Sequence, residues 1–229
     1  EFIIRDGAID WQNFGKIVKY LCKIEESCIR GEYVKRGEIR LRTSATLDDA
    51  ALNNAPLMFR EKEHYINPLE HGWQQRYYKT LFTPNNTPKN IAANYLEGLE
   101  WVFRYYTDKC VDWHWKYKYN YPPLLEDLVH VVPKSKVDSL IPVRTSSPLH
   151  PHTQLCFVLP SDYLRQILPK FPIEKYQQYY EFKGKFEWAF CRYFWEAHLS
   201  IDEEMPLSEL LKIDHEHCSS VKNNKKIKK

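Results

Sequence analysis

Apolar residues recur every three or four positions in two stretches of the chain, the spacing that places them on one face of a helix. The first stretch follows Asp10, a residue type that caps helix N-termini. Its apolar residues are Trp11, Phe14, Ile17, Val18 and Leu21. The second stretch follows Thr87-Pro88, where proline suits the first helical position. Its apolar residues are Ile91, Tyr95, Leu99, Val102, Phe103 and Tyr106. The pattern therefore predicts two packing helices.

The helical spacing stops after Asp108, and aromatic and polar residues alternate from residue 113 to residue 121. A period of two with Tyr and Trp is typical of an extended segment. One face would carry Trp113, Trp115, Tyr117, Tyr119 and Tyr121, and the other His114, Lys116, Lys118 and Asn120. Pro122-Pro123 would end the segment, because proline extends neither a helix nor a ladder.

The remaining segments predict short helices joined by loops. The charged residues 25–49 are expected to form a linker or an inserted loop, and the Pro/Ser-rich residues 133–151 a second loop. A short apolar segment spans residues 154–159. Helices are expected at residues 161–168, 174–180 and 205–211, and the rings of residues 185–199 mostly in the core. The predicted fold class is mainly α: one helical domain over residues 1–221, with a few short extended segments and long loops.

The charge of the chain is concentrated at its end. The formal net charge is +3, and five lysines follow residue 221: Lys222, Lys225, Lys226, Lys228 and Lys229. Without them, 28 basic residues remain against 30 acidic ones. A nucleic acid would therefore have to bind to a local basic groove. Residues 222–229 are expected to form a basic disordered tail, with a nucleic-acid-binding or nuclear-localisation arm as the alternative.

Several functional classes find no support in the sequence. Neither G-x-G-x-x-G nor G-x-x-x-x-G-K-[ST] occurs, so the common nucleotide-binding loops are absent from this stretch. The six cysteines are scattered without a C-x-x-C pair, which is typical of reduced thiols in an intracellular protein, nuclear or cytoplasmic. No apolar run reaches the roughly 20 residues of a membrane span. The first residue is Glu1 rather than Met, so we expect the chain to begin inside a longer polypeptide.

The aromatic run of residues 101–123 is the main candidate for function. Nine of its first 21 residues are aromatic, whereas cores are built mainly from aliphatic side chains. Tyr and Trp rings can line a wet groove and stack on flat ligands such as bases. A second cluster in HGWQQRYYKTLF sets Arg76 and Lys79 beside two tyrosines, which suits either a stacked, phosphate-bearing strand or a cation–π surface. The alternative for the run itself is that all its rings are core.

A resemblance to a known family rests on four blocks in order: GWQQRYYKTLF, NYLEGLEWVFRYYTDKCVDWHWKYKYNYPPLLEDL, HTQLCFVLPSDYLRQILP and FEWAF. They resemble the helical second conserved region of XRN-type 5′-to-3′ exoribonucleases, over roughly residues 9–211. The family's motif typically continues Tyr-Tyr-Pro-Tyr-His-Tyr-Ala-Pro. Tyr117, Tyr119, Tyr121 and Pro123 keep this pattern, and Lys116, Lys118, Asn120 and Pro122 depart from it. The chain thus resembles a divergent member.

The resemblance implies that this region binds the substrate and that another region carries out catalysis. This region would pack against an upstream catalytic region of the same or a separate polypeptide and guide RNA with a 5′ monophosphate to the active site. Trp113 or Trp115 would stack on the first base, and Tyr117, Tyr119, Arg76 and Lys79 would be further substrate-binding residues. The acids that bind Mg²⁺ belong to the upstream region.

This chain by itself would therefore hold no catalytic residue and no metal ligand, and would be inactive. Its acidic pairs lie in surface-like stretches: Glu25-Glu26, Asp48-Asp49, Glu126-Asp127 and Glu203-Glu204. Two alternatives stay open. One is a catalytically inactive RNA- or partner-binding module, and the other is a purely structural helical domain.

Overall fold

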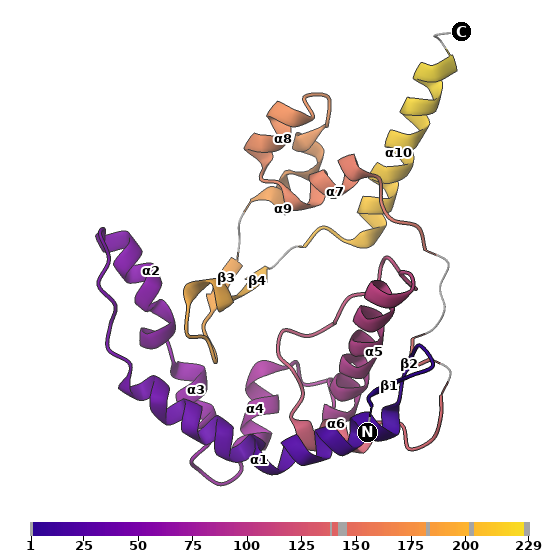
Figure 1. Ribbon diagram of the computed structural model, residues 1–229. Coiled ribbons are helices and arrows are strands. Elements are labelled where there is room, and N and C mark those ends of the chain that lie inside the picture. The colour runs from indigo at the N-terminus through magenta and orange to yellow at the C-terminus, as the bar shows by residue number, and fades with distance from the viewer. Residues whose placement is uncertain (1, 138, 142–145, 182–183, 202–203, 227–229) are drawn as a thin grey trace. The chain divides into compact units, whose positions relative to one another are not determined.

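The computed structural model describes residues 2–137, 139–141, 146–181, 184–201 and 204–226, with the backbone alone for residues 200, 201 and 217–226 (Figure 1). The chain forms two compact units. Unit 1 consists of residues 1–146 and 188–198, and unit 2 of residues 147–187 and 199–229. Helices dominate both, which confirms the mainly α fold class. The single domain expected over residues 1–221 would include most of both units, and its boundaries stay a prediction.

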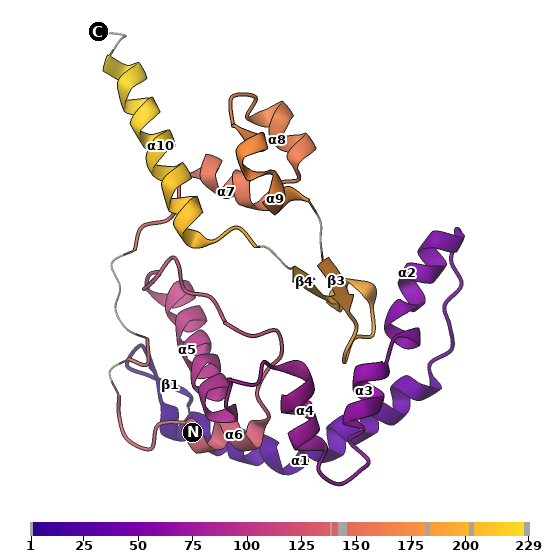
Figure 2. The same cartoon turned by 180° about the vertical axis from the view of Figure 1, so that it is seen from behind.

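Unit 1 is built on one long helix, α1 (Trp11–Glu38), with β1 (Ile4–Arg5) and β2 (Ala8–Ile9) pairing antiparallel before it. Figures 1 and 2 show α1 along the base of the unit, with the next helices above it. These are α2 (Leu47–Met58), α3 (Glu61–Ile66), α4 (Trp73–Leu81), α5 (Pro88–Thr107) and α6 (Leu125–Val131). Helix α6 packs on both α1 and α5, so it joins the two longest helices of the unit.

Helix α1 begins where the sequence predicts and ends much later. The Asp10 side chain accepts a hydrogen bond from the Asn13 N–H at 3.0 Å, so the predicted N-cap is confirmed. Residues 25–38, expected in a loop, are helical; that expectation was wrong for them, and only residues 39–46 before α2 are irregular. The charged side chains form a solvated helix face with internal pairs, such as Glu26 with Arg30 at 2.5 Å.

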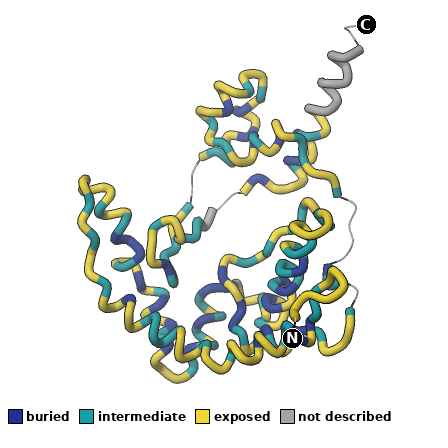
Figure 3. The backbone as a smooth tube through the Cα atoms, in the orientation of Figure 1, coloured by how far each residue is buried: buried dark blue, intermediate teal, exposed yellow. Residues whose placement is uncertain are grey.

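The core of unit 1 consists of two clusters (Figure 3). One comprises Ile66, Trp73, Tyr77, Leu81, Phe82, Ile91, Tyr121, Leu124 and Ala189. The other comprises Trp11, Val18, Ala92, Leu96, Leu128 and Val132. Tyr121 comes from the far end of the aromatic run and Leu124 follows directly after it, so the end of this run closes the core around α4.

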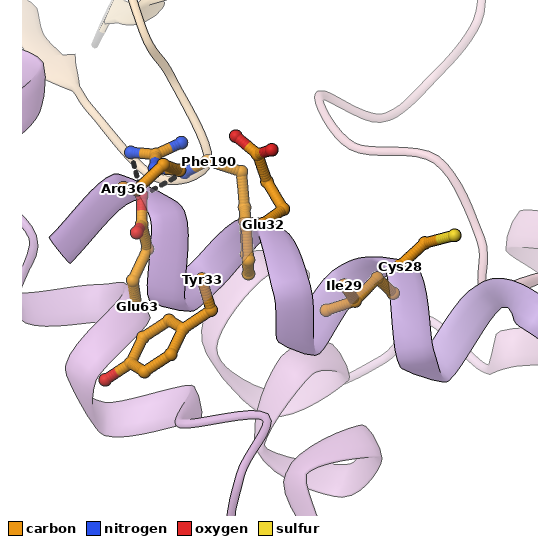
Figure 4. Close-up of a pocket in the computed structure, with 7 residues that line it drawn as sticks. All are labelled: Cys28, Ile29, Glu32, Tyr33, Arg36, Glu63 and Phe190. Atoms are coloured by element: carbon orange, nitrogen blue, oxygen red, sulfur yellow. Dashed lines mark hydrogen bonds and ion pairs between the residues drawn. The ribbon is translucent and has the colours of Figure 1, made fainter. Parts of the chain in front are cut away.

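A buried carboxylate joins three parts of unit 1 (Figure 4). Glu63 on α3 is 0% exposed, and its Oε1 accepts hydrogen bonds from Arg36 Nη2 at 2.6 Å and from the Phe190 N–H at 2.5 Å. Its Oε2 accepts from Arg60 Nε at 2.9 Å. Arg36 and Arg60 are themselves buried. Because Phe190 belongs to the returning segment of residues 188–198, Glu63 fixes that segment to α1 and α3.

The returning segment does not bury its rings as expected. Ala189 and Cys191 are buried, but Trp195 in the short 3₁₀ helix η2 (Phe194–Glu196) is 65% exposed. Trp195 stacks on Tyr193 with ring centroids 4.4 Å apart, and the Arg42 guanidinium lies 4.5 Å from the Tyr193 centroid. The expectation of a mostly buried aromatic stretch was wrong, because these rings cover one another outside the core.

Helix α5 contains the beginning of the aromatic run. The Thr87 hydroxyl accepts from the Asn90 N–H at 3.2 Å and Pro88 is the first helical residue, as predicted. The predicted stripe is buried at Ile91, but Tyr106 at the C-terminal end is 80% exposed. A Cβ on Gly98 would lie 2.7 Å from Cη2 of Trp115, so Trp115 can lie on this helix only because residue 98 has no side chain.

Unit 2 is smaller and has its own core. It contains α7 (Pro151–Val158), α8 (Ser161–Ile167), η1 (Ile173–Tyr176), α9 (Gln177–Tyr180), β3 (Gly184–Glu187) and α10 (Leu207–Lys226). Strand β3 pairs with β4 (His198–Ile201). The hydrophobic core cluster of unit 2 comprises Cys156, Leu164, Ile173, Tyr176, Met205, Leu210 and Ile213. Asp214 Oδ1 accepts from the His150 N–H at 2.6 Å and from the Thr153 hydroxyl at 2.8 Å, which ties α10 to α7.

The elements of unit 2 follow the expected order with local differences. The short helices expected at residues 161–168, 174–180 and 205–211 are present as α8, as η1 with α9, and within α10. The apolar segment of residues 154–159 forms most of α7, and Pro160 is the N-cap of α8. Helix α10 continues to Lys226, residues 227–229 lie outside the described residues, and the predicted tail stays a prediction. None of the described helices is long and apolar enough to cross a membrane.

We expect Glu63→Gln to lower the free energy of unfolding by about 3–5 kcal/mol, because it leaves two buried arginines without a compensating charge. Urea unfolding followed by circular dichroism measures this loss. Glu61→Gln is the matched control, since Glu61 lies exposed on the same helix and should cost no more than about 0.5 kcal/mol. Equal effects of the two variants would contradict the role of Glu63.

We expect Gly98→Ala to destabilise the protein by about 1–3 kcal/mol, because the added methyl group collides with the Trp115 ring. Alanine normally stabilises a helix interior by about 1 kcal/mol relative to glycine. Gly31→Ala in α1 is the matched control, since nothing lies within 4 Å of its added Cβ, and it should stabilise. The same urea titration compares the two, and stabilisation by both would argue against close packing of Trp115.

Candidate nucleic-acid interface

The segment after α5 has the predicted extended character only in part. Residues 113–121 contain no helix, but they form no strand either; Trp113 and His114 lie in a turn, and the backbone after them is irregular. Because no sheet holds these residues, their positions depend on ring contacts with α5 and on hydrogen bonds. The rings predicted to share one face consequently lie in different environments.

Trp115 belongs to a stack on α5. Its ring lies 5.8 Å from the Trp101 ring at an interplanar angle of 21°, and it covers Gly98. Trp101 stacks in turn on Tyr105, with centroids 5.2 Å apart and planes 9° apart. The Trp101 Nε1–H donates to the Asp112 carbonyl at 2.8 Å, so the stack also fixes the start of the turn. Trp115 is thus held by the helix.

Trp113 has a different environment. Its ring is 46% exposed and makes an edge contact with Tyr105, with centroids 6.3 Å apart and planes at 87°. The backbone N–H of Trp113 donates to the Ser146 hydroxyl at 2.7 Å. Trp113 is therefore a large, partly exposed ring on a backbone that is hydrogen-bonded in place, which suits a stacking ligand.

Tyr105 lies next to Trp113 and Tyr106 next to Tyr105, and neither was among the predicted site residues. Tyr105 is exposed and contacts Trp113 directly, and Tyr106 makes a T-shaped contact with Tyr105 at 5.4 Å. The helical pattern assigned Tyr106 to the buried stripe. The signal that could have identified them is their position in the last turn of α5, where the core contacts of the helix end.

Tyr117 and Tyr119 lie among core side chains. Tyr117 contacts Tyr95 at 5.7 Å and donates its hydroxyl to the Tyr121 carbonyl at 2.8 Å, and Tyr119 packs on Phe82 at 5.8 Å. Burial raises the pKa of the Tyr117 hydroxyl above its ordinary value, so the group stays neutral. Within the described part of the chain neither ring has a ring contact with Trp113. Their role as substrate-binding residues stays a prediction.

Arg76 and Lys79 lie on α4. The Arg76 guanidinium donates to the carbonyls of Ile66 and His71, each at 2.9 Å, and to that of Asn67 at 3.3 Å, so it holds the turn before α4. Lys79 is exposed. Among the described residues, neither cation lies over a tyrosine ring. Their contact with substrate stays a prediction.

The two tyrosines between Arg76 and Lys79 have structural contacts. Tyr77 donates its hydroxyl to the Pro122 carbonyl at 2.8 Å, and Tyr78 donates to Asp127 Oδ2 at 2.6 Å. Burial raises the pKa of both hydroxyl groups. They join α4 to the end of the aromatic run.

The described acidic side chains do not fit a Mg²⁺ site. Magnesium sites need carboxylates that converge from several elements. Glu25 accepts the Leu125 N–H at 2.8 Å, Asp49 accepts the Thr46 hydroxyl at 2.7 Å, and Asp127 accepts the Tyr78 hydroxyl. Over the described residues, no three His, Cys, Asp or Glu side chains gather where a metal could bind.

Comparison with known proteins agrees with the resemblance. A family model described as the Xrn1 helical domain matches residues 34–178, a narrower span than the expected residues 9–211. The chain is 35% identical over 106 residues to 5′-3′ exoribonuclease 2 of Candida glabrata and 33% identical over 103 residues to that of Gallus gallus. It is 36% identical over 115 residues to 5′-3′ exoribonuclease 1 of Saccharomyces cerevisiae.

These alignments cover 44%, 43% and 48% of this chain, and 10%, 10% and 7% of the respective relatives. The chain thus corresponds to about a tenth of the length of the curated relatives it matches. The family model itself covers more than half of the chain and includes α5, the W-x-W turn and α6. The chain therefore belongs to the Xrn1 helical domain family, whose relatives here are named 5′-3′ exoribonucleases.

Proposed function

We propose that this chain is the helical half of a 5′-to-3′ exoribonuclease site, in which Trp113 stacks on the first base of an RNA with a 5′ monophosphate and guides the strand to the reacting centre. The observation that supports Trp113 over Trp115 is the difference in packing. Trp115 lies between Gly98 and Trp101, whereas Trp113 is 46% exposed on a fixed turn.

The surroundings of Trp113 suit a base with its phosphate. Tyr105 adds an exposed ring against Trp113 and Tyr106 another against Tyr105, and rings of this kind stack on bases regardless of sequence. Lys116 and Lys118 follow on exposed positions of the same segment and supply positive charge for the RNA backbone. The family's typical pattern has no lysine at these two places, so this charge would be particular to the present chain.

In the complete enzyme, RNA would be hydrolysed processively from the 5′ end, releasing mononucleotides. Mg²⁺ would activate water and stabilise the leaving oxygen there. The acids that hold the metal would belong to an upstream catalytic region of the same or a separate polypeptide. The residues of this chain would bind the first base, orient the 5′ end and exclude alternative paths for the strand.

We expect Trp113→Ala to weaken binding of a 5′-phosphorylated oligouridine to the chain by about ten- to a hundredfold, because stacking contributes roughly 1–3 kcal/mol per base. Fluorescence anisotropy of a labelled oligonucleotide measures the change. Trp195→Ala is the matched control, since it removes another exposed tryptophan of unit 1, and it should leave affinity unchanged. Undiminished affinity of the Trp113 variant would refute the stacking assignment.

We expect the purified 229-residue chain to leave 5′-phosphorylated RNA intact in the presence of Mg²⁺, because its described carboxylates do not gather into a group that could hold the metal. Gel analysis of end-labelled RNA checks this, with a 5′-hydroxyl RNA in parallel to detect contaminating nucleases. Degradation of the 5′-phosphorylated RNA, with the 5′-hydroxyl RNA left intact, would show that this chain carries catalytic residues. The alternative, an inactive RNA-binding module, would be favoured if the natural full-length polypeptide bound RNA but had no nuclease activity.

A further inference from the structure

Three consecutive backbone N–H groups of the W-H-W turn bond to the same two residues. The Trp113 N–H donates to Ser146 Oγ at 2.7 Å, and the His114 N–H donates to Asp112 Oδ1 at 2.9 Å. The Trp115 N–H lies 3.4 Å from the Asp112 carbonyl oxygen. The backbone on both sides of the exposed Trp113 ring is therefore held by Asp112 and Ser146.

The two residues are also bonded to each other. The Ser146 hydroxyl donates to Asp112 Oδ1 at 2.8 Å. A hydroxyl group has one hydrogen and two lone pairs, so this bond orients a lone pair of Ser146 toward the Trp113 N–H. Asp112 is buried, and its carbonyl accepts the Trp101 Nε1–H from α5. The pair thus connects the turn to the rigid aromatic stack.

We infer that Asp112 and Ser146 are positioning residues, which hold Trp113 in its stacking orientation before RNA arrives. We call this hydrogen-bonded pair the clamp. The inference rests on the proposed function of Trp113. A side chain that is already ordered loses less conformational freedom on binding, so loss of the clamp should weaken affinity by about two- to tenfold. Ser146 lies in the irregular segment before α7, and its two hydrogen bonds to described residues serve this turn. A contribution to core packing would not explain them.

The test compares Ser146→Ala with Ser146→Thr in the full 229-residue chain, with 5′-phosphorylated oligouridine as the probe. The alanine variant removes the hydroxyl group, and the threonine variant keeps it and should restore binding. Ser139→Ala is the matched control, because Ser139 belongs to the same loop but bonds to Glu100 and the Ile141 carbonyl. It should leave affinity unchanged.

A second measurement reports the clamp without RNA. In a chain labelled with 5-fluorotryptophan, the seven tryptophans give ¹⁹F signals, and Trp113→Phe identifies the one that belongs to residue 113. Ser146→Ala should shift or broaden that signal, and Ser139→Ala should not. This readout distinguishes a loss of ring orientation from a general loss of stability.

The outcomes separate this inference from the proposed function. Weaker binding and an altered Trp113 signal in Ser146→Ala, both restored in Ser146→Thr, support the clamp. An unchanged signal and unchanged affinity in Ser146→Ala, while Trp113→Ala weakens binding, overturn the clamp and leave the stacking role intact. If Trp113→Ala has no effect on binding, the stacking role fails, and the positioning role for RNA fails with it even where the ¹⁹F signal moves.

Discussion

The fully buried carboxylate of Glu63 is the interaction on which unit 1 depends most. It accepts hydrogen bonds from Arg36 on α1, from Arg60 before α3 and from the Phe190 N–H of the returning segment. Burying one carboxylate with two guanidinium groups costs desolvation energy, which is offset only while all partners are present. The returning segment is thereby fixed at a defined place after the chain has passed through unit 2. The Ala189 side chain can then complete the core cluster around Trp73.

The second constraint is the ring stack on α5. Gly98 allows Trp115 to lie directly on the helix, Trp115 covers Trp101, and Trp101 covers Tyr105. Aromatic pairs in offset stacks contribute beyond the area that they bury, so a continuous stack stiffens the surface without a sheet. This rigid support explains how an irregular segment can present one exposed ring in a fixed position. The candidate interface therefore depends on packing inside the helix face next to it.

Much of the fold could be predicted because its signals are local. Asp10, Thr87 and Pro88 mark helix starts through hydrogen bonds within one turn, and the structure confirms each of them. The loop expected after residue 25 was wrong because helix α1 continues. Its charged face looks like a linker in the sequence, and the partner of Arg36 lies on another helix. The rings of residues 185–199 were expected in the core, yet Trp195 and Tyr193 stack outside it with Arg42. Each error involves one contact between residues far apart in the chain, Arg36 with Glu63 and Arg42 with Tyr193.

The sequence by itself determined the class of the protein: a mainly helical domain with a dense aromatic run and the block order of the Xrn1 helical domain family. These properties follow from residue identity and spacing, which a single sequence contains in full. Only the tertiary structure decided which tryptophan of the W-H-W turn is the more exposed. Trp113 and Trp115 have the same chemistry and the same alternation, and they differ only in their neighbours. Gly98 and Trp101 cover one, whereas Ser146 and Asp112 hold the other partly exposed.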